Sequence, residues 1–96
     1  MQDGAVQDAA MQDGAVQIRV RYWGSAREAA GRAEDVVEAA GLREAVAAIA
    51  DRYGERFRRI VEMSTIVVDG ERLAPHAQVE VRDGSVVEVM PPFAGG

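Results

Sequence analysis

The stretch Val16-Gln-Ile-Arg-Val-Arg-Tyr22 alternates apolar and polar side chains from end to end. This period of two predicts a β-strand with one buried face, because successive side chains of a strand point to opposite sides of its sheet. Trp23 follows out of phase with the buried set, which places its indole on the side away from a covering helix. We expect Trp23 either to cover the far face of the sheet or to contact a partner, and both interpretations stay open.

A second strongly apolar strand is expected at Val86–Met90, near the other end of the chain. It stops where Pro91 and Pro92 follow, because proline has no N–H to donate to a strand ladder. Apolar strands tend to be the central ones of a sheet. We therefore expect the first and the last strand in the middle of a mixed sheet.

Between these strands, one segment has the spacing of an amphipathic helix. Apolar side chains recur at helical intervals from Leu42 to Tyr53, and charged side chains lie largely on the opposite side. Gly54 is a candidate end of this helix, since glycine adopts the left-handed conformation that often follows a last turn. Phe57 and Ile60 would continue the apolar side if the chain made another turn, so this boundary is left open.

The remaining elements are short and are expected from local patterns. Ser25 is a candidate N-cap for a short helix that Gly31 ends, and Asp69-Gly70 has the composition of a tight hairpin turn. Short strands around one good helix predict an α+β fold of two layers, in which a mixed sheet packs on one main helix. The further strand candidates are Ala33–Ala39, Ser64–Val68, Glu71–Leu73 and Val79–Val81.

Residues 1–15 differ from the domain that follows. The heptad Met-Gln-Asp-Gly-Ala-Val-Gln at 1–7 returns unchanged at 11–17. Two copies of a small polar heptad cannot bury enough surface to order themselves, so we expect 1–15 to be a disordered, duplicated leader. The folded domain is then 16–90, residues 91–96 form an extended tail, and either Met1 or Met11 is the start.

Composition excludes several classes of function. A chain of 96 residues suits one small domain, and a formal net charge of −5 has the wrong sign for holding a nucleic-acid backbone. Charged residues interrupt every apolar run before it reaches membrane-spanning length. Cysteine is absent and all 11 basic residues are arginine, which excludes disulfides, thiolate chemistry and lysine Schiff bases. With no signal-peptide pattern near the start, we expect a cytoplasmic protein whose partners include neither nucleic acid nor a membrane.

A catalytic or metal-binding constellation is not evident in the sequence. His76 is the single histidine and lies in a polar connection, where a surface role is expected. The acidic pair Glu34-Asp35 falls at a junction, and Asp69 with Glu71 falls in a turn, so solvated loop charge explains both. We expect no bound metal, no bound cofactor and no catalytic activity of the chain by itself.

The end of the chain, Met90-Pro-Pro-Phe-Ala-Gly-Gly96, suits threading into a partner. The prolines restrict the stem to extended geometry, the phenylalanine offers an apolar anchor, and the last small residues pass through a tunnel too narrow for larger side chains. The terminal carboxylate is then the group that is delivered. A frayed terminus is the alternative. The residues expected to enter a partner are Pro92, Phe93, Ala94, Gly95 and Gly96.

Five stretches together resemble one known family. They are Val16–Trp23, Ser25–Gly31, the Leu42 helix, Val68–Gly70 and Gly84–Gly96. In combination they are similar to the small, ubiquitin-like subunit of molybdopterin synthase, and the resemblance covers nearly all of 16–96. Its most specific part is the Pro-Pro-Phe-Ala-Gly-Gly ending, whereas the terminal Gly-Gly is shared with thiamine-pathway carriers and ubiquitin-like modifiers. The resemblance implies a β-grasp fold; the duplicated leader and the lack of lysine depart from the family.

The resemblance also implies a mechanism. An ATP-dependent enzyme similar to ubiquitin activators would adenylate the Gly96 carboxylate, and a sulfur donor would displace AMP to leave a terminal thiocarboxylate. The large subunit of the synthase would receive the tail, where the thiocarboxylate supplies sulfur to cyclic pyranopterin monophosphate. The chain is then a non-catalytic carrier, and ATP is used only by the activating enzyme. Docking on the large subunit is expected around Trp23 and Met90.

Two alternatives to this function stay open. The first alternative is a different protein of the same fold: a carrier for thiamine, cysteine or tRNA sulfur chemistry, or a modifier conjugated to lysines of other proteins. The second alternative is a plain interaction domain whose Gly-Gly ending is incidental.

Overall fold

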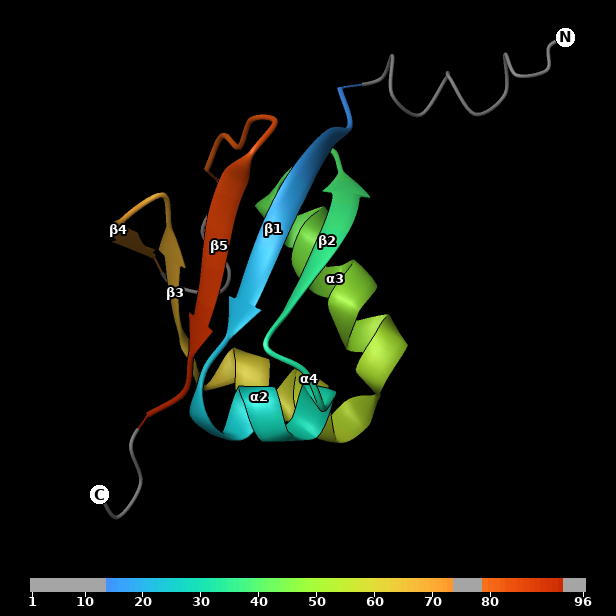
Figure 1. Cartoon of the computed structure of the whole chain (residues 1–96), viewed down its shortest axis with the longest axis vertical. Coiled ribbons are helices and arrows are strands. Elements are labelled where there is room, and N and C mark those ends of the chain that lie inside the picture. The colour runs from blue at the N-terminus through green and yellow to red at the C-terminus, as the bar shows by residue number, and fades with distance from the viewer. Residues whose placement is uncertain (1–13, 74–78, 93–96) are drawn as a thin grey trace, which may run out of the picture.

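Strand β1 (Val16–Tyr22) forms as its alternation predicts, with Ile18, Val20 and Tyr22 buried. The computed structural model describes residues 14–73 and 79–92, and within them β1 belongs to a mixed sheet (Figure 1). Residues 1–13 of the predicted 1–15 leader and four of the predicted tail residues lie outside the described residues. The other described strands are β2 (Glu34–Ala39), β3 (Thr65–Val68), β4 (Glu71–Leu73) and β5 (Ser85–Met90).

The strands follow the order β2-β1-β5-β3-β4 across the sheet. Strand β1 runs parallel to β5 and antiparallel to β2, and β3 runs antiparallel to both of its neighbours. The prediction that the first and last strands lie in the middle of a mixed sheet is therefore confirmed. Because β1 and β5 are parallel, their C-terminal ends meet at the same end of the sheet, where the chain continues into its tail.

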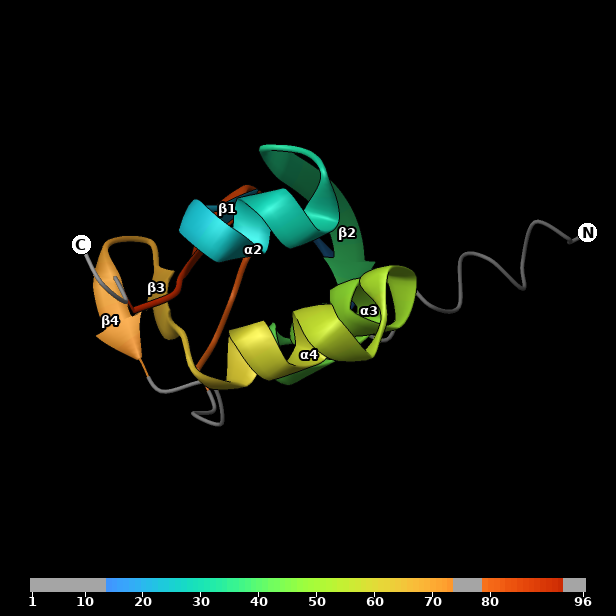
Figure 2. The same ribbon diagram turned by 90° about the horizontal axis from the view of Figure 1, so that it is seen from below.

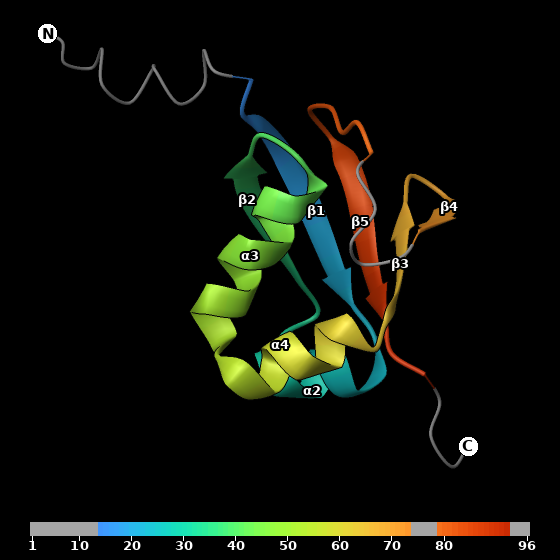
Figure 3. The ribbon, with the colours of Figure 1, turned by 180° about the vertical axis from the view of Figure 1, so that it is seen from behind.

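The described helices are distributed unequally around the sheet. Helices α3 (Leu42–Tyr53) and α4 (Glu55–Glu62) cover one face (Figure 3), and α2 (Gly24–Ala30) lies across the end of the sheet beside α4 (Figure 2). No described helix packs on the opposite face. We call this side, which carries Arg21, Val67 and Glu88, the open face.

The predicted main helix matches α3 from its first residue to its last, and Gly54 ends it. The boundary that the sequence left open is decided by a second helix, α4, which begins directly after Gly54 and buries Phe57 and Ile60. Gly54 has φ of 97° and ψ of −171°, a conformation essentially restricted to glycine. The chain therefore changes direction at this residue, and the apolar side continues in a separate helix.

Two local predictions are wrong. Ser25 does not cap α2, because the helix begins at Gly24 and the capping position is Trp23, which makes no side-chain cap hydrogen bond. Val79–Val81 is not a strand, although Val81 is buried against the core. Both sides of β5 are already paired, with β1 and with β3, so the alternating valines pack without joining the ladder. Gly31 does end α2, with φ of 75°.

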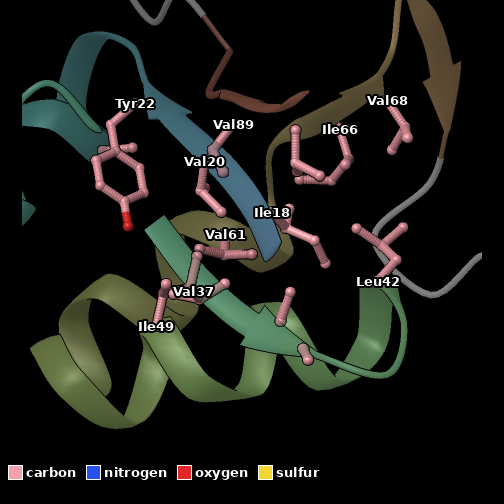
Figure 4. Close-up of a cluster of buried hydrophobic side chains, with 14 of the residues drawn as sticks. Ile18, Val20, Tyr22, Val37, Leu42, Ile49, Val61, Ile66, Val68 and Val89 are labelled. Atoms are coloured by element: carbon pink, nitrogen blue, oxygen red, sulfur yellow. The ribbon is translucent and has the colours of Figure 1, made fainter. Parts of the chain in front are cut away.

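The core lies between the sheet and helices α3 and α4. Figure 4 shows side chains of β1 and β3 meeting those of the helices, with Ile18, Ile49 and Val61 among them. Tyr22 packs edge-on against Phe57, with ring centroids 5.4 Å apart. This two-layer arrangement confirms the predicted α+β class with a mixed sheet packed on a main helix. Among the described residues, no helix is long and apolar enough to cross a membrane.

Candidate functional site

The candidate site lies where β5 ends and the C-terminal tail begins. Met90 is half-buried and pairs with Thr65 of β3, and the two prolines that follow offer no N–H for further pairing. Pro92 is exposed. The predicted tail residues Phe93, Ala94, Gly95 and Gly96 lie outside the described residues, so their part in the site stays a prediction.

Strand β5 gives the tail a firm starting point. It is hydrogen-bonded along one side to β1 and along the other to β3, and its inward side chains Val87 and Val89 are buried. A central strand with a buried face opens only when much of the core opens with it. The residues after Met90 therefore leave the domain from a well-defined place at the end of the sheet.

Trp23 stands beside this exit. Its backbone N–H donates to the Val89 carbonyl at 3.1 Å, and its indole Nε1 donates to Glu88 Oε1 at 2.9 Å. The guanidinium of Arg21 lies over the ring, 5.3 Å from its centroid. Trp23 thus covers part of the open face, which was one of its two predicted roles. It also keeps 38% of its surface exposed, so its contact with a partner remains a prediction.

A shallow hollow of about 200 Å³ adjoins the start of the tail. Its walls come from three strands and the first tail residues, and its lining residues are Thr65, Arg72, Met90, Pro91 and Pro92. The hollow combines an apolar wall, one hydroxyl group and one guanidinium. Met90 and Pro92 are predicted site residues. Arg72 could not be predicted from the sequence, because only the pairing of β4 with β3 brings that arginine near the end of β5.

A row of five side chains crosses the open face next to this hollow. Strand register places them in the order Arg72, Val67, Glu88, Arg21 and Glu34, with each residue directly opposite the next. Arg21 Nε lies 3.9 Å from Glu34 Oε1, and Glu88 accepts the indole hydrogen bond of Trp23. Alternation along each strand would have assigned these residues to the exposed side, but their order required the strand order.

Asp35 is the main buried charge in the described part of the chain, and it lies on the helix-covered side of β2. The prediction that Asp35 is a solvated loop charge is wrong, because its side chain is only 4% exposed. Tyr22 donates to its Oδ2 at 2.7 Å, Tyr53 donates to the same oxygen, and Oδ1 accepts from Arg52 at 3.1 Å. Arg32 lies 3.2 Å away as a further cation.

These contacts explain the titration of the cluster. Burial alone raises the pKa of Asp35, but the two tyrosine hydrogen bonds and the two guanidiniums outweigh it and hold that pKa below its ordinary value. Burial, followed by the hydrogen bond to Asp35 and its negative charge, raises the pKa of Tyr22 and of Tyr53. Every group in the cluster has a partner within it, so the arrangement is that of a structural clamp.

The described residues hold no cluster of three His, Asp or Glu side chains that suits a metal ion. His76, which the sequence analysis assigned to the surface, lies outside the described residues. The described part of the site presents an apolar and cationic surface where β5 ends.

Comparison with known proteins points to one family. A model of the ThiS family matches residues 20–96. No curated protein sequence matches the chain.

Solved structures also resemble this one. Small archaeal modifier protein 1 from Methanosarcina acetivorans has a TM-score of 0.73 at 16% identity, covering 85% of this chain and 98% of its own. A Pyrococcus furiosus protein, provisionally described as molybdopterin converting factor subunit 1, has a TM-score of 0.67 at 29% identity, with 81% and 99% covered. The complex of subunits 1 and 2 of molybdopterin-converting factor from Helicobacter pylori contains a chain with a TM-score of 0.63 at 21% identity, with 84% and 100% covered. These likenesses confirm the predicted β-grasp fold.

Proposed function

This chain belongs to the ThiS family of ubiquitin-like sulfur carriers, and on that premise we propose that it is the small, sulfur-carrying subunit of molybdopterin synthase. The observation that carries the proposal is the extent of the family match, which begins in β1 and runs to Gly96. The match therefore includes the Ala-Gly-Gly ending. Its terminal carboxyl group provides a place for sulfur in a chain that has no cysteine.

The proposed chemistry begins with activation of the Gly96 carboxylate, because a carboxylate is a poor electrophile. In a separate activating enzyme, a carboxylate oxygen attacks the α-phosphorus of ATP, which forms an acyl adenylate and releases pyrophosphate. Hydrosulfide from a sulfur donor then attacks the carbonyl carbon; the C–S bond forms, the C–O bond to AMP breaks, and a proton is released. The product is a terminal thiocarboxylate.

The proposed acceptor is cyclic pyranopterin monophosphate, bound in the large subunit. The thiocarboxylate sulfur attacks a carbon of the acceptor; the C–S bond forms and the bond from that carbon to an oxygen substituent breaks, with the oxygen as the leaving group. Water then cleaves the resulting thioester, so that sulfur stays on the acceptor and the Gly96 carboxylate is restored. Two such deliveries supply the two sulfur atoms of a dithiolene. The small subunit contributes position rather than acid–base groups, because the catalytic side chains belong to the large subunit in this proposal.

The structure around the start of the tail supports a positioning role for the small subunit. Strand β5 is central and paired on both sides, so the tail is presented from a firm base. Small residues without bulky Cβ substituents suit a narrow channel. Trp23 and Met90 stand beside the exit and offer apolar surface for docking on the protein that receives the tail.

Two comparisons support molybdopterin synthase in particular. The Pyrococcus furiosus protein that shares 29% identity over nearly its whole length is provisionally described as molybdopterin converting factor subunit 1. The Helicobacter pylori structure is a complex of subunits 1 and 2 of that factor. A large-subunit partner for this chain follows by analogy with that complex, and the Pro-Pro-Phe-Ala-Gly-Gly ending is consistent with it.

The first test is the intact mass of the untagged chain after incubation with ATP, a sulfide source and an activating enzyme. We expect a gain equal to the replacement of one oxygen by sulfur, which fragmentation locates at Gly96. A variant lacking Gly95 and Gly96 serves as the control and should gain nothing. An unchanged wild-type mass, with an activating enzyme that modifies its own carrier in parallel, would refute the carrier proposal.

The acceptor is tested separately. With the thiocarboxylated chain, the large subunit of molybdopterin synthase should convert cyclic pyranopterin monophosphate to a dithiolene product. The family match alone fits a second candidate, a carrier for thiamine, cysteine or tRNA sulfur chemistry. Transfer to the thiazole-forming enzyme of thiamine synthesis, with none to the pyranopterin, would favour that second candidate.

A further inference from the structure

The hollow beside the tail exit is lined by an arginine, Arg72, whose role the fold does not explain. Arg72 lies on β4, the edge strand, and is exposed. Within residues 14–73 and 79–92, no carboxylate comes within 4 Å of its guanidinium, whereas the other charges of the cross-sheet row have described partners. Glu88 accepts a hydrogen bond from Trp23, and Arg21 pairs with Glu34.

The position of Arg72 ties it to the tail. It shares the hollow with Met90, Pro91 and Pro92, the residues that connect β5 to the last four residues of the chain. A protein that takes up the tail in a channel must close around its root. Its surface therefore has to pass over this hollow, and a side chain of that surface is available to fill it.

We propose that the hollow formed by Thr65, Arg72, Met90, Pro91 and Pro92 receives an acidic side chain of the subunit that accepts the tail. This inference rests on the proposed function, since it needs a subunit that takes up the tail. A guanidinium offers a fork of N–H donors that matches a carboxylate, and Thr65 adds a hydroxyl donor. Met90 and the prolines supply an apolar wall for the methylene groups of that acidic side chain.

Charge complementarity between Arg72 and an acidic side chain of the partner would make the interface specific. The chain has a net charge of −5, so its field as a whole favours a basic partner and disfavours acidic groups in the interface. The Arg72 guanidinium attracts an acidic side chain locally, at the root of the tail. Such a contact defines how the partner is seated around the tail and discriminates against surfaces that lack the acid.

The test compares two charge reversals in the full-length chain, Arg72→Glu and the control Arg56→Glu. Arg56 is an exposed arginine on α4, which packs on the other side of the sheet. The dissociation constant for the large subunit of molybdopterin synthase is measured by calorimetry at low and high salt. We expect Arg72→Glu to weaken binding about tenfold at low salt and less at high salt, and Arg56→Glu to change it less than about twofold.

A second measurement identifies the partner's residue. The chain has no cysteine, so Arg72→Cys provides a single attachment point for a benzophenone maleimide. Irradiation of the complex should crosslink Arg72→Cys to a segment of the large subunit that contains an Asp or Glu, as read by mass spectrometry. Arg56→Cys should not crosslink there. Unchanged melting temperatures of the variants show that the fold is retained.

Three results would overturn the inference. They are binding of Arg72→Glu within twofold of wild type, equal weakening by Arg56→Glu, and a crosslink to a segment without acidic residues. Thiocarboxylate formation at Gly96, read by intact mass, tests the proposed function separately, because that step uses the activating enzyme and not the subunit that accepts the tail.

Discussion

Asp35 shows how one side chain connects three elements. It belongs to β2, and it accepts hydrogen bonds from Tyr22 at the end of β1 and from Tyr53 and Arg52 at the end of α3. A buried carboxylate is costly unless its lone pairs are satisfied, and here both oxygens have donors. The cluster therefore holds the end of the helix against the strands rather than performing chemistry.

Asp35→Asn is predicted to destabilise the fold by about 2–4 kcal/mol, because the amide returns only part of the hydrogen bonding and removes the charge that faces the two arginines. Urea unfolding at neutral pH measures the loss. The control is Asp51→Asn, since Asp51 also meets an arginine, Arg58 at 3.2 Å, but is 79% exposed. The control should cost less than about 0.5 kcal/mol. Equal effects would refute the clamp.

The same cluster predicts how stability depends on pH. The pKa values of Tyr22 and Tyr53 are raised in the folded state, so their contribution is present below the unfolded value of about 10 and is lost as pH rises through the folded values. The pKa of Asp35 is lowered, so its contribution is present above about 4 and is lost as pH falls through the folded value.

Unfolding free energies measured across the alkaline range should therefore decrease above about pH 10, and Tyr22→Phe should reduce that decrease. In acid, the difference between wild type and Asp35→Asn should shrink below about pH 4. A Tyr22→Phe variant with the same alkaline slope as wild type would contradict the assignment of the raised pKa to this cluster.

At the scale of elements, two turns determine how the layers meet. Asp69 and Gly70 have positive φ values of 48° and 92°, which suit the tight turn between β3 and β4. Asp69 also accepts hydrogen bonds from Ser85 Oγ and the Val86 N–H, so this turn is joined to β5. Gly54 separates α3 from α4, and both helices can then face the same sheet.

Gly54→Ala is predicted to cost about 1–3 kcal/mol, because its backbone conformation is essentially restricted to glycine. Thermal unfolding followed by circular dichroism measures the effect. The control is Gly41→Ala at the start of α3, where φ is −166° and an added Cβ meets only the Glu44 carboxylate end, at 3.0 Å. That change should be nearly neutral, and a loss as large as that of Gly54→Ala would refute strain as the cause.

On the scale of the whole molecule, one face of the sheet stabilises the fold and the other is available for binding. The helix-covered face holds the core and the Asp35 cluster, whereas the open face carries Trp23, the cross-sheet charges and the hollow at the root of the tail. Substitutions on the open face should therefore alter binding with little effect on folding, and substitutions in the core should do the reverse.

Changes in the tail should separate an effect on function from an effect on folding most clearly. Adding one residue after Gly96, or replacing Gly95 by Val, should abolish sulfur transfer and leave the melting temperature unchanged, because the tail follows the last strand and the change affects only threading. A transfer assay with the large subunit and a thermal melt measure the two effects. Normal transfer by either variant would refute threading through a narrow channel.

Much of the fold could be predicted because local patterns determine it. The alternation of β1, the helical spacing of α3 and the Asp-Gly turn after β3 all agree with the structure. The strand proposed at Val79–Val81 and the solvated state proposed for Asp35 were wrong for a shared reason. Both depend on neighbours distant in sequence, namely the strands already paired with β5 and the tyrosines that surround the carboxylate.

Local sequence patterns account for most of the elements and for their buried faces, because backbone propensity and side-chain period act within a single segment. Tertiary structure alone decided which strands are neighbours. Register then brought Arg72, Met90 and Pro92 around one hollow and placed Trp23 beside Glu88. Strand order arises from burying every apolar face against one shared core, a requirement that involves the whole chain at once and that no single segment expresses.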